Sequence, residues 1–199
     1  MPRAGLSAEV VVAEAARLVD EHGPGALTLA GLAQRFGVAQ PSLYKHVGGL
    51  ADLHGRLAVL AATDLASRLR TAAVGRAGAD ATAAVATAYR DYARQHPGRY
   101  GYLLRPRPDD DAHTRASGEV LEVLLGVLAG YGISGAPDAV DAARFVRSVL
   151  HGFVSLETGG GFAMDRSVDD SFERLVGSLD RALTTWPGQP RPPAGRLAG

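Results

Sequence analysis

The spacing of apolar residues is the feature that most restricts the fold of this 199-residue chain. Over long segments, apolar side chains recur three and four positions apart, which places them on one face of an α-helix. No segment has the alternation of a half-buried strand, and the valines at residues 10–12 are too short a run to form one. We therefore predict an all-α fold of roughly nine helices, separated by segments that contain glycine and proline.

A change of character near residue 50 divides the predicted fold. Residues 1–50 carry short helical segments separated by glycine, whereas residues 51–187 carry longer helices with wide apolar faces. Residues 188–199 alternate proline, glycine and arginine, a composition typical of a disordered tail. The prediction is an N-terminal domain of three helices followed by a larger C-terminal helical domain.

Composition excludes several kinds of site. The chain has no cysteine, which excludes disulfides, thiolate zinc sites and a cysteine nucleophile. No apolar run approaches the ~20 residues that cross a bilayer, and residues 1–5 do not form a secretory signal, so we expect a cytoplasmic protein without a membrane partner. Because the net charge is zero, any affinity for nucleic acid has to come from a local patch.

The stretch from Thr28 to Val47 has the pattern of two short helices joined by a tight turn. Thr28 is a suitable N-cap for the first helix, and Gly37 stands where the turn requires a positive φ. Pro41 suits the first turn of the second helix, because its missing N–H costs nothing there. Leu43 and Val47, four positions apart, are predicted to anchor that helix to the core. This is the arrangement of a helix-turn-helix.

The residues left on the outer face of the second helix suit contact with DNA. Glutamine can bond base edges bidentately, serine can serve bases or phosphates, and tyrosine, lysine and histidine can reach phosphates. Proline offers an apolar edge to a thymine methyl group. The second helix of such a unit enters the major groove with its N-terminal residues at the bases. The candidate DNA-contacting residues are Gln40, Pro41, Ser42, Tyr44, Lys45 and His46.

The run from Gln40 to Val47 closely resembles the recognition helix of the tetracycline-repressor (TetR) family, in which a small residue, Leu, Tyr, any residue, His and then Phe or Val are typical. The end of the first helix at residues 20–23 and the start of the next long helix at residues 52–53 also resemble that family. The resemblance implies a transcriptional regulator, a repressor that a small-molecule effector releases from double-stranded operator DNA. It also implies that Thr28 helps to contact a phosphate.

Two positions depart from the family pattern. Leu50 stands where relatives often place a lysine that meets a phosphate, and the first short helix, which continues with Ala30, lacks the arginine that some relatives aim at a base. Fewer cationic contacts predict weaker non-specific binding and a shallower dependence of DNA affinity on salt.

Two apolar stripes, on predicted helices at residues 137–158 and 168–186, suit either a core or self-association through a four-helix bundle. The TetR resemblance implies that these helices form a homodimer, which would present two reading heads to two half-sites. Residues 150–157 also resemble a TetR subgroup with a Trp-His-Gly motif, although Leu150 replaces the tryptophan. The predicted dimer interface consists of Val146, Leu150, Phe172, Leu175, Leu179 and Leu183.

The resemblance further implies that the C-terminal domain holds the effector between its helices, with no cofactor. Aromatic and apolar residues are the candidates for lining such a cavity, although each also suits ordinary packing. These residues are Tyr89, Tyr92, Tyr100, Tyr102, Leu103, Leu121, Leu125 and Phe153. No pattern of charge pairs selects an ion, a drug or an acyl chain as the effector.

The rival interpretation is an all-α enzyme or small-molecule carrier, which would need ionisable groups converging in a pocket. The acidic run at residues 109–111 with His113 reads as a solvated loop before a helix, because three adjacent carboxylates cannot all point at one ion. Ser155 has no glycine elbow and no assignable His and Asp partners. His151 and Glu157 lie six positions apart and do not share a helix face. We therefore predict no enzymatic activity and no metal site.

Overall fold

The computed structural model describes residues 6–104 and 110–187, and within these ranges it contains helices and no strand, which confirms the predicted all-α fold. The predicted tail at residues 188–199 lies outside the described residues. None of the helices described is long and apolar enough to span a membrane. The α-helices are α1 (Ala8–His22), α2 (Leu29–Phe36), α3 (Leu50–Ala73), α4 (Gly78–Gln95), α5 (Pro97–Tyr100), α6 (Asp111–Ala129), α7 (Asp138–Thr158) and α8 (Val168–Thr184), and the 3-10 helices are η1 (Pro24–Ala26), η2 (Gln40–Lys45) and η3 (Gly101–Leu104).

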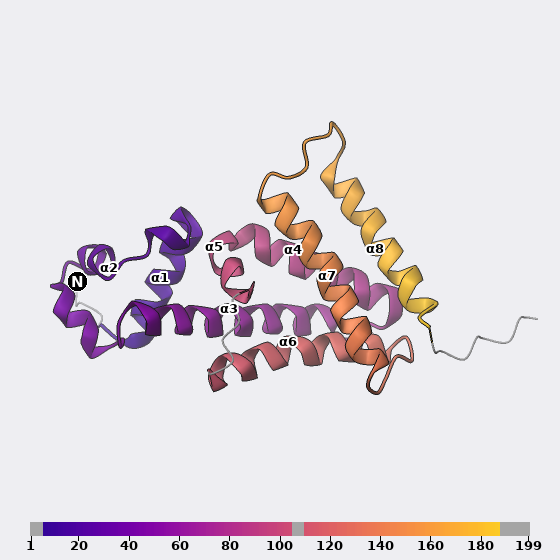
Figure 1. Ribbon diagram of the computed structural model, residues 1–199, viewed down its shortest axis with the longest axis horizontal. Coiled ribbons are helices and arrows are strands. Elements are labelled where there is room, and N and C mark those ends of the chain that lie inside the picture. The colour runs from indigo at the N-terminus through magenta and orange to yellow at the C-terminus, as the bar shows by residue number, and fades with distance from the viewer. Residues whose placement is uncertain (1–5, 105–109, 188–199) are drawn as a thin grey trace, which may run out of the picture. The chain divides into compact units, whose positions relative to one another are not determined.

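The chain forms two compact units (Figure 1). The first unit comprises Met1–Arg68 and Asp91–Val120, and the second comprises Leu69–Arg90 and Leu121–Gly199. Helices α3, α4 and α6 therefore each contribute one part to each unit. The first unit extends beyond the predicted N-terminal domain because α3 and η3 supply side chains to the same core as α1 and α2. A division of function at residue 50 stays a prediction.

The core of the first unit begins with the apolar stripe of α1. The Ser7 hydroxyl caps this helix by accepting a hydrogen bond from the Val10 N–H, and Val11, Ala15 and Val19 are fully buried. Other buried side chains from α2, η2, α3 and η3 complete the cluster, namely Leu32, Leu43, Val47, Leu53, Leu57 and Tyr102.

Helix α2 begins and ends where its sequence predicts. The Thr28 hydroxyl accepts a hydrogen bond from the Gly31 N–H at 3.0 Å. At the other end Gly37 adopts φ 65°, a conformation that favours glycine. The Gly37 N–H then donates to Gln34 O and the Val38 N–H donates to Ala33 O, the pair of hydrogen bonds that closes a Schellman turn.

In the second unit, α7 and α8 lie side by side and are joined by the exposed segment 159–167 (Figure 1). Their inward side chains meet those of α4 and α6 around a void of about 10 Å³, which has room for one water molecule at most. The interior of this unit is therefore closed. The void is lined by Thr82, Val85, Ala86, Leu124, Val127, Leu128, Val146, Leu150, Leu179 and Leu183.

Candidate nucleic-acid interface

The second helix of the predicted pair is the 3-10 helix η2, not an α-helix of residues 41–47. The His46 N–H donates to Leu43 O at 2.9 Å, and the Ser42 N–H donates to Ala39 O at 2.9 Å, both in the i→i+3 pattern. Pro41 has no N–H to extend the pattern, and with six residues η2 is longer than the usual run of 3-10 structure. The prediction of a helix at this place is confirmed, and the sequence pattern did not specify its type.

One side of the helix η2 packs into the core and the other side is exposed. Leu43 and Val47 are buried at 0% and 2% exposure, as the spacing of these two residues predicts, while Tyr44 is 55% exposed. Of the other candidates, Gln40, Pro41 and Lys45 are exposed, and Ser42 and His46 are half-buried. The six predicted DNA-contacting residues of η2 and its C-cap are thus all at least partly accessible.

Thr28 is also exposed, and its hydroxyl oxygen is already occupied as the acceptor that caps α2. A hydroxyl group carries one proton to donate in addition to its lone pairs. The Thr28 O–H therefore remains suited to donate to a phosphate oxygen while the cap stays in place.

The connection between η2 and α3 is fixed by an acid that the sequence reasoning did not single out for this role. Asp52 Oδ2 accepts from the Gly48 N–H at 2.8 Å and from Arg56 Nε at 2.9 Å. Partial burial acts to raise the pKa of Asp52, but the Gly48 N–H and the Arg56 guanidinium hold that pKa below its usual value. The sequence signal for this role of Asp52 is an acidic residue in the first turn of a helix, four residues after a glycine.

Most cations of this region are already paired. Arg35 of α2 contacts Glu14 and Glu21 of α1, and Arg17 bonds the same two acids. Lys45, the one lysine of the sequence, has no ion pair among the described residues. The surface around η2 therefore presents little unpaired positive charge, in line with the departures at Leu50 and Ala30.

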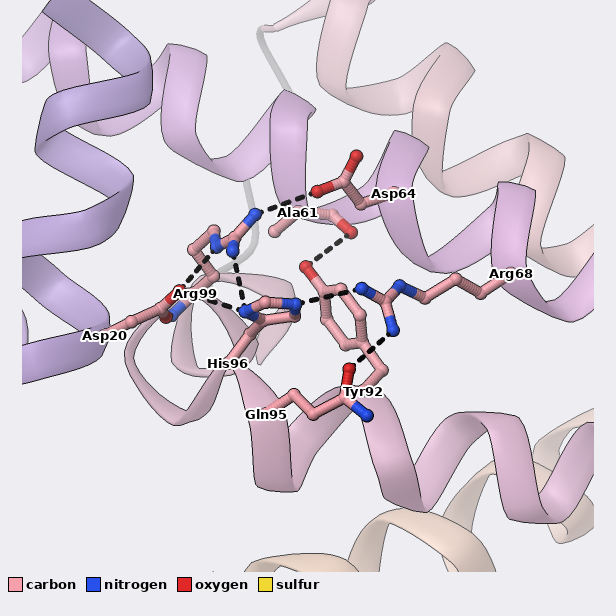
Figure 2. Close-up of polar contacts among 8 residues, drawn as sticks. All are labelled: Asp20, Ala61, Asp64, Arg68, Tyr92, Gln95, His96 and Arg99. Carbon is pink, nitrogen blue, oxygen red and sulfur yellow. Dashed lines mark hydrogen bonds and ion pairs between the residues drawn. The ribbon is translucent and has the colours of Figure 1, made fainter.

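A polar network joins α1 to α3 and α5 within the first unit (Figure 2). Arg99 of α5 donates from Nε to Asp20 Oδ2 at 2.7 Å and from NH1 to Asp64 Oδ2 at 2.9 Å. The Arg99 backbone N–H also donates to Asp20 Oδ1 at 2.8 Å. Asp20 is thus held by three contacts, counting the 3.2 Å approach of His96 Nδ1.

His96 lies between two guanidinium groups in this network (Figure 2). Arg68 NH2 is 3.0 Å from His96 Nε2, and Arg99 NH2 is 2.6 Å from His96 Nδ1. Arginine can only donate and a neutral ring accepts at one nitrogen, so His96 accepts either from Arg68 at Nε2, with its Nδ1 proton toward Asp20, or from Arg99 at Nδ1. Burial and the positive charge of Arg99 lower the pKa of His96, which favours this neutral form.

Gly98 brings the start of α5 against the end of α1. A β-carbon at this position would stand 1.9 Å from the carbonyl oxygen of Val19 and 2.7 Å from the amide nitrogen of Asp20. No side chain fits there without moving backbone. The glycine is therefore required by the close approach of two helices, and sequence spacing gave no sign of it.

The eight residues predicted to line an effector cavity are divided between the two units. Tyr92, Tyr100, Tyr102 and Leu103 belong to the first unit, and Tyr89, Leu121, Leu125 and Phe153 belong to the second. The five aromatic residues are buried, Leu103 and Leu125 are half-buried, and Leu121 is 45% exposed. None of the eight lines the enclosed void of the second unit.

Two of these tyrosines have internal partners. Tyr92 OH donates to Ala61 O at 3.1 Å, and burial raises the pKa of Tyr92. Tyr102 OH lies 2.8 Å from His54 Nδ1, with the two rings 5.6 Å apart. Both side chains therefore serve the packing of the first unit, and contact with an effector stays a prediction.

The predicted dimer-interface residues are mostly interior in the single chain. Val146, Leu150, Phe172, Leu179 and Leu183 are each less than 7% exposed, and Leu175 is half-buried. More accessible apolar residues of α7 and α8, together with Trp186 just after α8, are called here the outer face of α7 and α8, namely Phe145, Val149, Leu156, Leu175 and Trp186. The rings of Phe145 and Trp186 lie 5.6 Å apart on this face.

The acidic run before His113, which the sequence analysis did not assign to a metal site, provides a helix cap. Asp110 Oδ1 accepts from the His113 N–H at 3.0 Å at the start of α6, and Asp109 lies outside the described residues. No cluster of three His, Asp or Glu side chains suited to a metal ion occurs in residues 6–104 and 110–187. The acidic run therefore has a structural role at α6.

Ser155 does have a histidine neighbour, contrary to the sequence reasoning. Its Oγ lies 3.1 Å from His151 Nε2, one helical turn away on α7. Glu157, the nearest acid along the chain, is bonded to Arg90 instead.

Comparison with known proteins matches two family models. Residues 11–53 match the bacterial regulatory proteins of the tetR family, and residues 82–179 match the tetracyclin repressor-like C-terminal domain. The uncharacterized HTH-type transcriptional regulator Rv0681 of Mycobacterium tuberculosis is 37% identical over 186 residues, which cover 91% of this chain and 85% of that protein.

Two solved structures illustrate the likeness in fold. A Rhodococcus protein of unknown function superposes with a TM-score of 0.79 at 22% identity, covering 92% of this chain and 99% of that one. A TetR variant from Acinetobacter baumannii in complex with minocycline superposes with a TM-score of 0.66 at 25% identity, covering 89% and 96%.

Proposed function

The chain belongs to the TetR family of HTH-type transcriptional regulators, and from this premise we propose that it is a repressor that binds operator DNA as a homodimer and leaves it when a small molecule binds. The observation that carries the DNA-binding part is the orientation of η2. Its apolar residues Leu43 and Val47 are buried, so its polar side chains are left on the outside. A short helix held in this way suits insertion into a major groove.

The roles proposed for these side chains follow from their chemistry. Gln40 and Ser42 read base edges, and Pro41 touches a thymine methyl. Tyr44, Lys45 and His46 bind phosphates, with the Thr28 O–H donating to one more phosphate at the start of α2. Because Lys45 is the principal unpaired cation here, we expect DNA affinity to fall only gently as salt rises.

The decisive experiment is a DNA-binding assay with DNA from the neighbourhood of the protein's own gene. The double variant Tyr44→Ala/Lys45→Ala should bind this DNA far more weakly than the parent while its circular dichroism is unchanged. Gln40→Ala should alter the preferred sequence, with a base contact contributing about 1–3 kcal/mol. Arg144→Ala, at an exposed site on α7, is the matched control. Unchanged affinity in the folded double variant would contradict the proposal.

The homodimer is proposed to form through the outer face of α7 and α8. Sedimentation should give about twice the 20.7 kDa chain mass. Leu156→Glu, at a side chain that is 52% exposed, should shift the chain toward monomer without unfolding it. Leu179→Glu is unsuitable for this purpose because Leu179 is 1% exposed and belongs to the core of the single chain.

Release by a small molecule rests on the family and on the minocycline complex of the Acinetobacter relative. The ligand must prefer the conformation that binds DNA less well, and operator DNA must then weaken ligand binding by the same factor. The test is to titrate one compound with and without operator. Equal compound affinity in the two titrations would mean that this compound does not control DNA binding.

A further inference from the structure

An open cavity lies in the second unit where α3 passes to α4, beside the second half of α6. Its volume of about 400 Å³ is within the range of small-molecule sites, whereas the interior void of this unit has about 10 Å³. All of its lining residues belong to the second unit. They are Arg70, Ala73, Val74, Arg76, Ala77, Ala81, Glu122, Val123, Gly126, Val127 and Gly130, and we refer to this cavity as the α3–α4 hollow.

The wall of the α3–α4 hollow is mostly apolar, and part of it belongs to the core. Val74 is 71% exposed, although a valine is normally covered, and Val123 is half-buried. Val127 lines both the hollow and the interior void, so the hollow reaches the packed interior of the unit. A molecule that covers these side chains removes apolar surface from water, which is favourable.

Gly126 keeps the hollow open on the side of α6. It is exposed, and a β-carbon built on it would meet no atom within 4 Å. Glycine is less stable than alanine in the middle of a helix, and no close contact requires a glycine here. Any side chain at this position would occupy part of the hollow.

The charged residues that line the hollow do not select a charged ligand. Arg70 already has an interaction partner within the protein. Arg76 and Glu122 carry opposite charges, and Arg76 NH1 donates to Ala72 O at 2.8 Å. An anion attracted by Arg76 is repelled by Glu122, and a cation experiences the reverse. Either ion would also lose hydration against the apolar wall, so an uncharged molecule is favoured.

We propose that the α3–α4 hollow binds a compact, uncharged, mostly apolar molecule such as a small aromatic compound. Its body covers Val74 and Val123 and rests against Val127. Any polar atom that it carries stays at the open side of the hollow, where water reaches it. The concave shape and the volume suit a small molecule rather than a flat protein surface.

This inference deepens the proposed effector release and rests on the proposed function only for the effect on DNA. The hollow is lined by the end of α3, the α3–α4 turn, the start of α4 and the second half of α6. A ligand that contacts these segments together stabilises their arrangement by its binding free energy. Because α3 contributes residues to both units, it is the element through which binding at the hollow would reach the helix-turn-helix.

The test uses the full chain without DNA and 3-methylindole as the probe, with indole-3-acetate and tryptamine as its anionic and cationic counterparts. Isothermal titration should show that 3-methylindole binds the parent more tightly than either ion does. Gly126→Leu, which fills the hollow from a helical position with free space, should abolish this binding. Val74→Asn should weaken it by about tenfold, the usual effect of no longer burying a valine side chain.

Two control variants separate the hollow from general effects of the substitutions. Gly118→Leu adds the same side chain to the same helix, at a position where a β-carbon also meets no atom within 4 Å but which does not line the hollow. Val140→Asn changes an exposed valine of α7 that does not line the hollow either. Both variants should bind 3-methylindole like the parent.

Four outcomes would overturn the proposal. The first is a parent protein that does not bind 3-methylindole, and the second is a Gly126→Leu protein that binds it like the parent. The third is tighter binding of either ion than of 3-methylindole. The fourth is a control variant that loses as much affinity as the variant with which it is matched.

A separate titration of operator DNA with 3-methylindole distinguishes this site from the proposed function. If 3-methylindole binds the free protein and weakens operator binding in the parent but not in Gly126→Leu, both stand. If it binds and operator affinity does not change, the α3–α4 hollow stands as a site and its part in operator release is overturned. If no operator binding occurs at all, the proposed function fails while the hollow is still judged by the titration without DNA.

Discussion

One arginine in each unit holds two carboxylates from other helices, and the two arginines differ in what surrounds them. Arg99 in the first unit binds Asp20 and Asp64, with His96 and Arg68 beside it (Figure 2). Its surroundings are polar, since the His96 ring and the Asp20 and Asp64 carboxylates lie against it. The Arg99 cluster therefore holds α1 against α5 by polar contacts more than by apolar packing.

Arg90 in the second unit has aromatic surroundings. It bonds Glu157 of α7 at 2.8 Å and Asp169 of α8 at 2.6 Å, and its guanidinium lies 4.6 Å from the Phe172 ring centre and 5.8 Å from that of Phe153. The hydrogen bonds that Arg90 donates to Glu157 raise the pKa of Arg90 despite its burial, and the one that it donates to Asp169 adds to the effect. The comparison teaches that similar ion pairs can have different roles. Arg90 stabilises the core of the second unit, whereas Arg99 holds α1 in place within the first unit.

The largest effect is expected from Arg90→Met. Arg90 is 7% exposed and the Glu157 side chain 15%, so the substitution leaves the Glu157 carboxylate without its partner in a place with little access to water. Loss of one partner of a buried pair typically destabilises a protein by about 3–5 kcal/mol. Urea unfolding should show a loss of this size.

Arg144→Met is the control for this variant, because the Arg144 side chain is 77% exposed and pairs only within its own helix turn. Its effect should be within about 0.5 kcal/mol, as for most surface substitutions. If Arg90→Met and Arg144→Met unfolded at the same urea concentration, the structural importance given to Arg90 would be wrong.

The next effect is expected from Gly98→Ala. The added methyl carbon would stand 1.9 Å from Val19 O, so α1 and α5 must separate. Overpacking of this kind costs about 1–3 kcal/mol of stability, and here the displaced element is α1, which packs against α2 of the helix-turn-helix. Operator affinity should fall in a titration performed well below the melting temperature, where the variant is still folded.

Gly101→Ala provides a matched control three residues away. A β-carbon at Gly101 meets no atom within 4 Å, and Gly101 has helical backbone angles. This variant should keep both the stability and the operator affinity of the parent. A Gly98→Ala protein that matched it in both measurements would show that the close approach of the helices is not needed.

An effect of similar size is expected from Asp20→Asn, with Asp64→Asn as its comparison. Asp20 is 13% exposed in its side chain and accepts from both the backbone and the guanidinium of Arg99, so loss of its charge should cost about 1.5–3 kcal/mol. Asp64 is more exposed and makes one bond to Arg99, so its loss should cost less than about 1 kcal/mol.

A double-mutant cycle with Arg99→Gln separates the two carboxylates. The coupling energy between Asp20 and Arg99 should exceed that between Asp64 and Arg99, because Asp20 makes more contacts in a less exposed place. Equal couplings would show that Arg99 does not orient α1 in preference to α3.

The sequence predicted what depends on neighbours along the chain. The cap at Thr28, the turn at Gly37 and the anchors Leu43 and Val47 all act within a few residues, so their spacing alone indicated the helix-turn-helix. The outward residues of η2 followed from those anchors. The change from α-helix to 3-10 helix was not predicted, because the hydrophobic spacing of so short a segment fits both.

What the sequence did not predict depends on residues far apart in the chain. Arg90 and Glu157 are 67 positions apart, and Arg99 and Asp20 are 79 positions apart. Gly98 has no local signal either, because the backbone that requires it belongs to α1. The same reason explains the cavity residues, since no local pattern shows whether a tyrosine such as Tyr92 faces a ligand or a neighbouring carbonyl group.

The smallest effect concerns pH and His96 in the Arg99 cluster. Burial and Arg99 lower the pKa of His96 in the folded protein below 6.5, the ordinary value that applies when the chain unfolds. As pH falls through and below 6.5, the unfolded chain therefore takes up the proton first, and the stability contributed by neutral His96 is lost. Unfolding free energies at pH 7.5 and 5.5 should show the parent losing stability on acidification and His96→Gln losing less.

His151 on α7 should add a similar loss of stability from the second unit, because burial and Arg147 lower its pKa. The variant His151→Gln measures that share, and the double variant His96→Gln/His151→Gln should depend on pH least. If His96→Gln and the parent lost the same stability between the two pH values, His96 would not be held neutral by burial and Arg99, and the Arg99 cluster would differ from that of Arg90 only in lacking phenylalanine rings.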